Sequence, residues 1–227
     1  RYSKGLMRIM LWNAENELNW TPAHVCWGWR PGRLDIGHSD WLDCSFRRRL
    51  LKELVEGIHK GNELAHGGVR QAAVTMNLHK TALQYCGYLN LLCPICPGIC
   101  CSTGHLEDEL AYWAEHLDII GLGIYDNYPF GWPLYNGTGE ITRRISELTS
   151  KPIMVMETGY PLRALAASEG CQCEYLRKGA LEAKENGAEG FFWFMLVDRC
   201  RIPECDHLPE EKLGMDIEVD IIEKEWG

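Results

Sequence analysis

Short apolar segments alternate with longer amphipathic segments along most of the chain. Five apolar segments have the length and the aliphatic and aromatic content of β-strands, at residues 7–13, 72–78, 119–125, 153–156 and 190–197. Between them, apolar residues recur at helical spacing at residues 45–61, 106–117, 140–148 and 174–186. The pattern therefore predicts repeated βα units and a parallel sheet, which is an α/β fold.

The first predicted helix has the clearest pattern. Its apolar face is formed by residues spaced three or four positions apart, namely Phe46, Leu50, Leu51, Leu54, Val55 and Ile58. Ser45 is the expected N-cap, and Gly61 is the expected stop. An amphipathic helix with both end signals supports the α/β interpretation.

Five βα units fit either an open doubly wound sheet or the larger part of a TIM (β/α)8-type barrel. No glycine-rich phosphate-binding turn follows the first strand, which argues against nucleotide binding on an open sheet. Polar and aromatic residues instead follow the predicted strands, namely Glu15, Asn16, Glu17, His79, Tyr125, Tyr128, Glu157, Trp193 and Asp198. Because the carboxyl ends of barrel strands carry the active site, this placement favours the barrel.

Two of these residues are glutamates that follow apolar segments, in LWNAENELNW (residues 11–20) and PIMVMETGYP (residues 152–161). Hydrolysis of a glycosidic bond needs one carboxyl group to protonate the leaving oxygen and another to attack the anomeric carbon or activate water. Glu17 and Glu157 are the candidate pair. Glu15 lies on the same strand face as Glu17 and is expected to be a supporting carboxylate or an ion-pair partner.

Composition narrows the classes of partner. The 227 residues carry a formal net charge of −9, which argues against nucleic acid and anionic membrane surfaces as partners. No apolar run reaches the ~20 residues that a bilayer-spanning helix needs. A neutral substrate fits this charge better.

The motifs ENEL, ETGYP and FFWF resemble strands four, seven and eight of the retaining glycoside hydrolases of clan A, which fold as (β/α)8 barrels. The resemblance implies that Glu17 is the general acid/base and that Glu157 is the nucleophile. It also implies four substrate-site residues: Asn16 at the 2-hydroxyl of the sugar, His79 as a polar contact, Tyr125 as a hydrogen-bond donor to the nucleophile, and Trp193 as a stacking platform.

Under this resemblance the chain holds strands four to eight, over about residues 7–214, and lacks a counterpart of the first three βα units. We therefore expect a single, partial barrel domain over residues 1–227, truncated at its N-terminus. A missing N-terminal segment or a partner chain would complete it, because five parallel strands do not close an eight-stranded barrel.

Eleven cysteines allow three interpretations: disulfides of a secreted protein, a zinc or iron-sulfur site, or free thiols. The run CPICPGICC, with Cys93, Cys96, Cys100 and Cys101, has metal-like spacing but no second CxxC or histidine pair at a fitting distance. Disulfides or free thiols are therefore favoured, and no metal or cofactor is predicted. Two Asn-x-Thr sequons, at Asn19 and Asn136, are compatible with the secreted location that we favour.

Aromatic residues add to the carbohydrate interpretation. Several of the nine tryptophans lie near the first motif and in the loop after residue 125, namely Trp12, Trp20, Trp27, Trp29, Trp41 and Trp132, whereas Trp113 is expected in the core. Sugar C–H faces stack on such rings, although the same tryptophans could form a small hydrophobic core under two long loops.

The predicted function is a retaining glycoside hydrolase that cleaves O-glycosidic bonds of a β-linked glycan by a two-glutamate double displacement. An oligo- or polysaccharide is the expected substrate. ETGYP is similar to the strand-seven motif of endo-β-1,4-galactanases and, less closely, of β-1,3-glucanases. Two alternatives are a catalytically silent carbohydrate-binding or structural barrel fragment, and a metal-dependent hydrolase that uses the cysteine cluster of residues 93–101.

Overall fold

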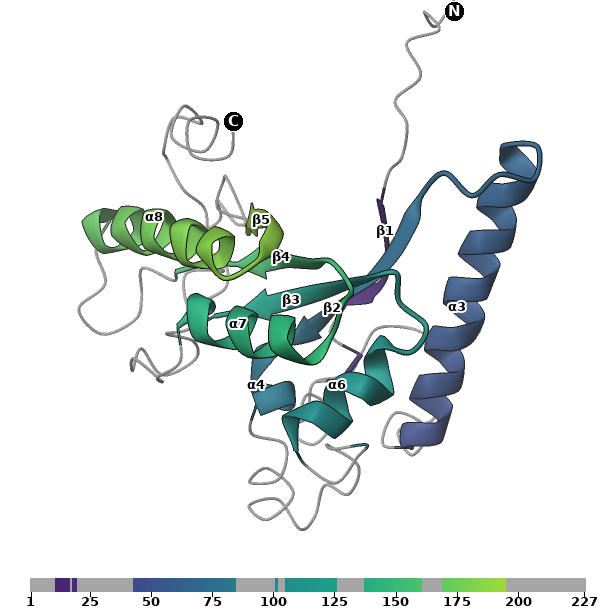
Figure 1. Cartoon of the computed structure of the whole chain (residues 1–227), viewed down its shortest axis with the longest axis horizontal. Helices are drawn as coiled ribbons and strands as arrows, with labels where there is room; N and C mark the ends of the chain where they lie inside the picture. Colours follow the sequence, from purple (N-terminus) through teal and green to yellow (C-terminus); the bar gives the residue numbers. More distant parts are fainter. Residues whose placement is uncertain are drawn as a thin grey trace, which may run out of the picture. The chain divides into compact units, whose positions relative to one another are not determined.

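The computed structural model describes residues 11–16, 18–19, 43–84, 101, 105–125, 137–160 and 169–194. They include a five-stranded sheet whose spatial order follows the chain, β1-β2-β3-β4-β5 (Figure 1). β1 pairs with β2 in parallel, and so does β4 with β5. The strands are β1 (Leu11–Asn16), β2 (Ala73–His79), β3 (Ile119–Ile124), β4 (Ile153–Thr158) and β5 (Ala188–Trp193).

Helices lie between the strands along the chain, which confirms the predicted α/β alternation. They are α3 (Cys44–Ala65), α4 (Lys80–Gln84), α6 (Leu106–Ala114), α7 (Thr138–Leu148) and α8 (Glu169–Glu185). The four predicted helices are all present. The short α4 directly after β2 was not predicted, because five residues are too few to show a helical period.

The strand ends differ from the prediction. β1 continues through Asn16 and β4 through Thr158, so that both strands include polar residues that were expected to follow them. The backbone pairing explains the extension, since Asn16 is still opposite Asn77 and Thr158 is still opposite Trp193. Residues 7–10 of the first predicted strand lie outside the described residues.

Both ends of helix α3 differ from the predicted ones. Asp43, rather than Ser45, is the N-cap, and its carboxylate accepts the Ser45 N–H at 2.8 Å. The helix passes through Gly61 and ends at Ala65. Gly67 follows the C-cap residue His66 with φ of 66°, and the Gly68 N–H donates to the Glu63 carbonyl at 2.7 Å. The positive φ favours glycine, which is why the helix stops here and not at Gly61.

The chain divides into two compact units, residues 1–121 and 122–227, with the boundary inside β3. In the first unit, β2 is buried on both faces from Val74 to Leu78, as expected for a strand in a parallel sheet covered by helices. Leu51 and Val55 of α3 contribute to this core. Trp113 of α6 is fully buried, which confirms its predicted place in the core.

An ion-pair cluster lies at the amino end of β3 in this unit. The Asp118 carboxylate accepts hydrogen bonds from His59 Nε2 at 2.8 Å, from the Val74 N–H at 2.9 Å and from Arg70 at 3.2 Å. Burial raises the pKa of Asp118, but the hydrogen bonds from His59 and Val74 and the charges of His59 and Arg70 outweigh it. The net result is a lowered pKa.

The second unit holds β4, β5, α7 and α8. α8 packs against β5 and alongside α7 (Figure 1). The buried apolar side chains are contributed by all these elements, among them Ile141, Ile145, Ile153, Val155, Leu176 and Ala183. Gly187 has φ of 94° and lies between α8 and β5, where the positive φ favours glycine.

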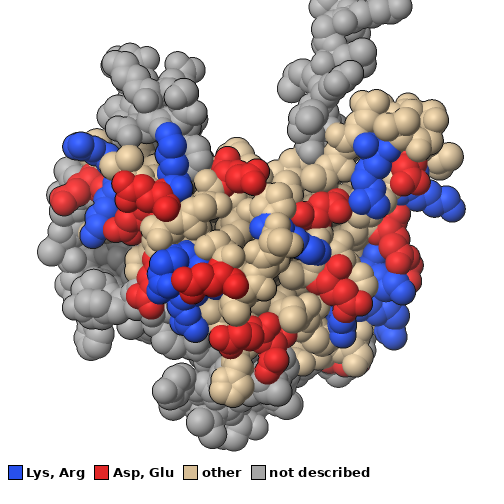
Figure 2. Space-filling view, viewed as in Figure 1, with Lys and Arg blue, Asp and Glu red and all other residues tan. Residues whose placement is uncertain are grey.

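Charged side chains of both signs are interspersed over the described surface in Figure 2, and no large single-sign patch is visible on that face. Within the described ranges, no helix has the length and apolar content to cross a bilayer.

Candidate active site

Glu157 is the next-to-last residue of β4, and its side chain is half-buried. Tyr125 directly follows β3, and its hydroxyl donates a hydrogen bond to Glu157 Oε1. Both residues belong to the unit formed by residues 122–227. A phenol that donates to a carboxylate oxygen restricts the carboxylate to one orientation. The structure therefore brings together two of the predicted site residues.

Trp193 is the last residue of β5 and is also half-buried. Its Cα partner across the β4–β5 ladder is Thr158, the residue after Glu157. Glu157 and Trp193 therefore lie at the carboxyl ends of neighbouring parallel strands. In an α/β sheet this is the edge at which ligands bind.

The first motif is described only in part. Asn16 is the exposed last residue of β1, and its Oδ1 accepts a hydrogen bond from Asn77 Nδ2 at 2.8 Å. The Glu15 carboxylate accepts the Asn16 N–H at 2.9 Å. Glu17 lies outside the described residues. The structure consequently leaves the pairing of Glu17 with Glu157 as a prediction.

His79 is the last residue of β2, and its ring is half-buried. The Asn19 side chain fixes its backbone from both sides: Asn19 Oδ1 accepts the His79 N–H at 2.9 Å, and Asn19 Nδ2 donates to the His79 carbonyl at 3.1 Å. This pair of bonds orders the carboxyl end of β2, which is the end where the predicted substrate contact is made.

The same contacts bear on the first sequon. Asn19 is fully buried, and its Nδ2, the atom to which a glycan would be attached, already donates to a backbone carbonyl. Asn19 is therefore a structural residue in this fold, and a glycan on it would break the contact with β2. Asn136 lies outside the described residues.

Two polar residues that support the predicted site were not found by sequence reasoning. Asn77 of β2 is buried, and besides binding Asn16 it donates its backbone N–H to Asn13 Oδ1 at 3.2 Å. Tyr175 of α8 contacts both Thr158 and Trp193. Asn77 lies inside an apolar strand and Tyr175 inside a helix, where single polar positions give no local signal of a site.

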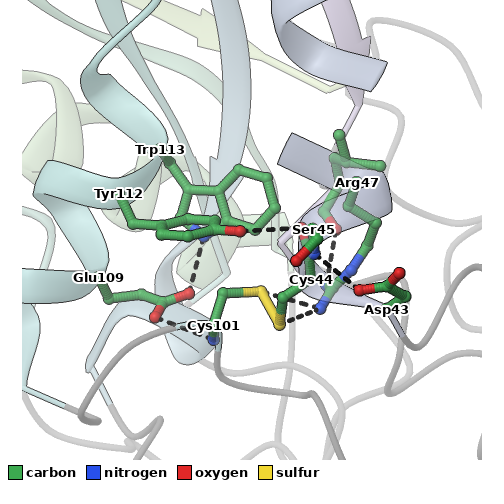
Figure 3. The surroundings of a disulfide bond; sticks show 9 residues. Asp43, Cys44, Ser45, Arg47, Cys101, Glu109, Tyr112 and Trp113 are labelled. Carbon is green, nitrogen blue, oxygen red and sulfur yellow. Dashed lines mark hydrogen bonds between the residues drawn. A yellow bond between two sulfur atoms is a disulfide. The ribbon is translucent and has the colours of Figure 1, made fainter. Parts of the chain in front are cut away.

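The described cysteines include one disulfide and one free thiol. Cys44, the first residue of α3, forms a disulfide with Cys101, with a Cα–Cα distance of 5.3 Å and a sequence separation of 57 (Figure 3). Cys101 belongs to the run with metal-like spacing, and a disulfide sulfur is not available as a thiolate ligand. Cys173 of α8 is a free thiol. Cys93, Cys96 and Cys100 lie outside the described residues.

A buried charge cluster surrounds this disulfide (Figure 3). Arg47 donates to both sulfurs, at 3.2 Å for Cys44 and 3.0 Å for Cys101, and to the Leu18 carbonyl at 3.2 Å. Burial lowers the pKa of Arg47 to about 10, against the opposing effect of the Glu109 charge. The guanidinium therefore remains charged at neutral pH.

Glu109 is the acceptor of the cluster. It is fully buried on α6, where its two oxygens accept the Trp113 Nε1–H at 2.7 Å and the Cys101 N–H at 3.2 Å. Both of these donors are groups of the protein itself. Among the described residues, no group of three or more His, Cys, Asp or Glu side chains is arranged to hold a metal ion.

No protein-family model matches the chain, and neither does any curated protein sequence. Solved structures do match it. A hyperthermophilic β-glucosidase mutant superposes with a TM-score of 0.53 at 15% identity, over 91% of this chain and 50% of that chain. A β-glucuronidase from an uncultured Clostridium superposes with a TM-score of 0.50 at 15% identity, over 96% and 32%. The GH53 catalytic domain of Ignisphaera aggregans has a TM-score of 0.46 at 15% identity, over 83% and 48%.

The likeness to the first two structures shows the fold of this chain: a parallel α/β sheet of the kind found in TIM-barrel glycoside hydrolases. The chain spans half or less of the length of each of these solved chains. In TIM barrels the active site lies at the carboxyl ends of the strands. Glu157 and Trp193 lie at the corresponding ends of β4 and β5.

Proposed function

We propose that this chain is the catalytic part of a retaining glycoside hydrolase that acts on a β-linked glycan. The observation that carries the proposal is the hydrogen bond from Tyr125 to Glu157, made at the carboxyl ends of the neighbouring strands β3 and β4, with Trp193 at the end of the next strand, β5. A carboxylate held by a phenol suits attack on a sugar carbon, and an aromatic ring at the end of the adjacent strand suits stacking of the sugar. The fold shared with β-glycoside hydrolases adds support.

The reaction has two steps. The Glu157 carboxylate attacks the anomeric carbon and forms a glycosyl ester, while Glu17 gives its proton to the departing glycosidic oxygen. Glu17 then takes a proton from water, and the resulting hydroxide equivalent breaks the ester and frees Glu157. The anomeric configuration is inverted twice and therefore retained. Tyr125 keeps the Glu157 carboxylate oriented in both steps.

Three further residues bind the sugar in this proposal. Trp193 offers a ring face for stacking, and Asn16 and His79 offer polar contacts from the ends of β1 and β2. The substrate is an oligo- or polysaccharide. The disulfide between Cys44 and Cys101 supports a location of the protein in an oxidising compartment, where such bonds persist.

The test is hydrolysis of a panel of aryl β-glycosides by the full chain and by Glu157→Gln. Loss of the nucleophile is expected to lower kcat on the order of 10⁴-fold or more. Glu189→Gln is the matched control, because Glu189 is an exposed glutamate on the neighbouring strand β5 and its loss should leave kcat unchanged. Equal activity of Glu157→Gln and the parent chain would rule out the nucleophile assignment.

Two more results separate the mechanism from its rivals. Azide should restore turnover of Glu157→Ala and give a glycosyl azide of inverted configuration, because a small anion can fill the space of the lost carboxylate. A parent chain that binds oligosaccharides but cleaves none of the panel would instead identify a carbohydrate-binding protein without catalysis.

A further inference from the structure

Tyr175 of helix α8 contacts the ends of both strands at the proposed site. Its hydroxyl shares a hydrogen bond of 3.2 Å with the Thr158 hydroxyl. Its ring meets the Trp193 ring edge to face, with centroids 6.1 Å apart and planes at 64°. A third ring, Tyr160, lies on it at a centroid distance of 5.3 Å. One helix residue thus contacts the strand of the nucleophile and the aromatic platform together.

Thr158 is the other half of this arrangement. It follows Glu157 directly, is fully buried, and accepts the Phe194 N–H on its carbonyl at 2.7 Å. Phe194 in turn follows Trp193. The end of β4 is therefore tied to the end of β5 through the backbone, and to α8 through the Tyr175 hydroxyl. Neither tie uses the Glu157 carboxylate.

From this geometry we infer that Tyr175 is a positioning residue that fixes the nucleophile strand and the sugar platform relative to each other. The inference rests on the proposed function. The Tyr175 hydroxyl acts on Glu157 through Thr158. The Tyr175 ring acts on the sugar through the orientation of Trp193. In this inference Tyr175 acts on the reacting atoms through these two residues.

The two parts of the side chain predict different kinetic effects. A misplaced nucleophile slows chemistry steeply, since an error of about 1 Å can cost ~10²-fold in rate. Loss of the hydroxyl should therefore lower kcat. Loss of the ring should in addition weaken binding, because a stacking platform contacts the sugar in the ground state as well as in the transition state.

The experiment compares three variants of the full chain. Tyr175→Phe keeps the ring contact with Trp193 and loses the hydroxyl, and it should lower kcat by about 10-fold with an unchanged KM. Tyr175→Leu loses both and should also raise KM several-fold. Tyr112→Phe is the matched control, because it removes a helix tyrosine hydroxyl bonded to the Cys44 carbonyl at 2.8 Å, in the other unit. It should change neither constant.

A readout independent of activity completes the test. Hydrogen exchange of the Phe194 amide reports on its bond to Thr158, and it should quicken in Tyr175→Phe but not in Tyr112→Phe. Unchanged exchange in Tyr175→Phe overturns the inference, whatever the activity. Quicker exchange with parental kcat and KM overturns it as well, because the contact is then only structural.

Failure of the proposed function has a different signature. It shows in the parent chain, as an absence of turnover across the glycoside panel or as full activity in Glu157→Gln, and the inference about Tyr175 falls with it. An active parent, an inactive Glu157→Gln and a parental Tyr175→Phe would reject the inference alone.

Discussion

The two compact units use buried polar groups in different ways. In residues 1–121 these groups bind the protein's own backbone and core: Glu109 accepts from Trp113 and Cys101, Arg47 donates to the disulfide sulfurs, and Asn19 brackets the backbone of His79. In residues 122–227 the buried Thr142 likewise binds backbone, at the Thr138 carbonyl, but a further set of polar contacts lies at the ends of β4 and β5, around a half-buried carboxylate.

Position along the strands explains much of this difference. Asp118 lies at the amino end of β3, where polar residues of α/β barrels serve stability, whereas Glu157 lies at the carboxyl end of β4, the edge at which we propose the active site. The same residue type is thus expected to matter for different measurements in the two units. Substitutions of Asp118 and of the buried charges Glu109 and Arg47 should change the free energy of unfolding, and those at Glu157 should change kcat.

The largest stability effect is expected from Glu109→Ala. The substitution removes the acceptor of two N–H groups. It also removes the carboxylate that has the largest electrostatic effect on the buried Arg47 charge. The free energy of unfolding should fall by about 3–5 kcal/mol, measured by urea denaturation. Glu107→Ala, an exposed change on the same helix, should stay within about 0.5 kcal/mol of the parent. A parental stability for Glu109→Ala would remove the contrast between the units.

The next effect is expected from the disulfide. Replacing Cys44 and Cys101 together by serine opens a loop of 57 residues and should lower the free energy of unfolding by about 2–4 kcal/mol. A thiol reductant should produce a similar loss in the parent chain and none in the double variant. Cys173→Ser serves as control, since this thiol is free in the second unit. Reductant sensitivity that persists in the double variant would show that another bond dominates.

The smallest effect is expected from Asp118→Asn, and it depends on pH. Because the folded-state pKa of Asp118 is lowered, its ionised form stabilises the fold above the unfolded-state pKa, and this stabilisation disappears as the pH falls through the folded-state pKa. The variant should be less stable than the parent by about 1 kcal/mol at pH 7. Denaturation at pH 7 and below pH 4 should show the difference shrinking; a constant difference would exclude linkage through Asp118.

Sequence reasoning was strong where one physical pattern sets the outcome. Apolar runs and helical spacing predicted the five strands and four of the five helices that lie in the described part of the chain. It was weaker at the element ends. Asp43 and Ser45 can both cap a helix, and only the backbone conformation decides which side chain accepts the N–H. Likewise, Gly61 and Gly67 look alike as stop signals until φ is known.

The candidate site shows the same limit. Glu157, Tyr125 and Trp193 were predicted because each follows or ends a recognisable apolar strand, and the contact between Tyr125 and Glu157 was implied by the resemblance. Tyr175 and the pairing of Cys44 with Cys101 were not predicted. These contacts join residues that are 17 to 57 positions apart, and no local pattern encodes which distant partner a side chain meets.

Covalent trapping tests the central claim most directly. The full chain is incubated with an activated 2-deoxy-2-fluoro β-glycoside, which slows breakdown of the glycosyl ester more than its formation, and the labelled peptide is identified by mass spectrometry. We expect one sugar per chain, carried on Glu157 within residues 152–161. A chain that turns over the parent glycoside yet carries the label on another carboxylate, or that stays unlabelled, would contradict it.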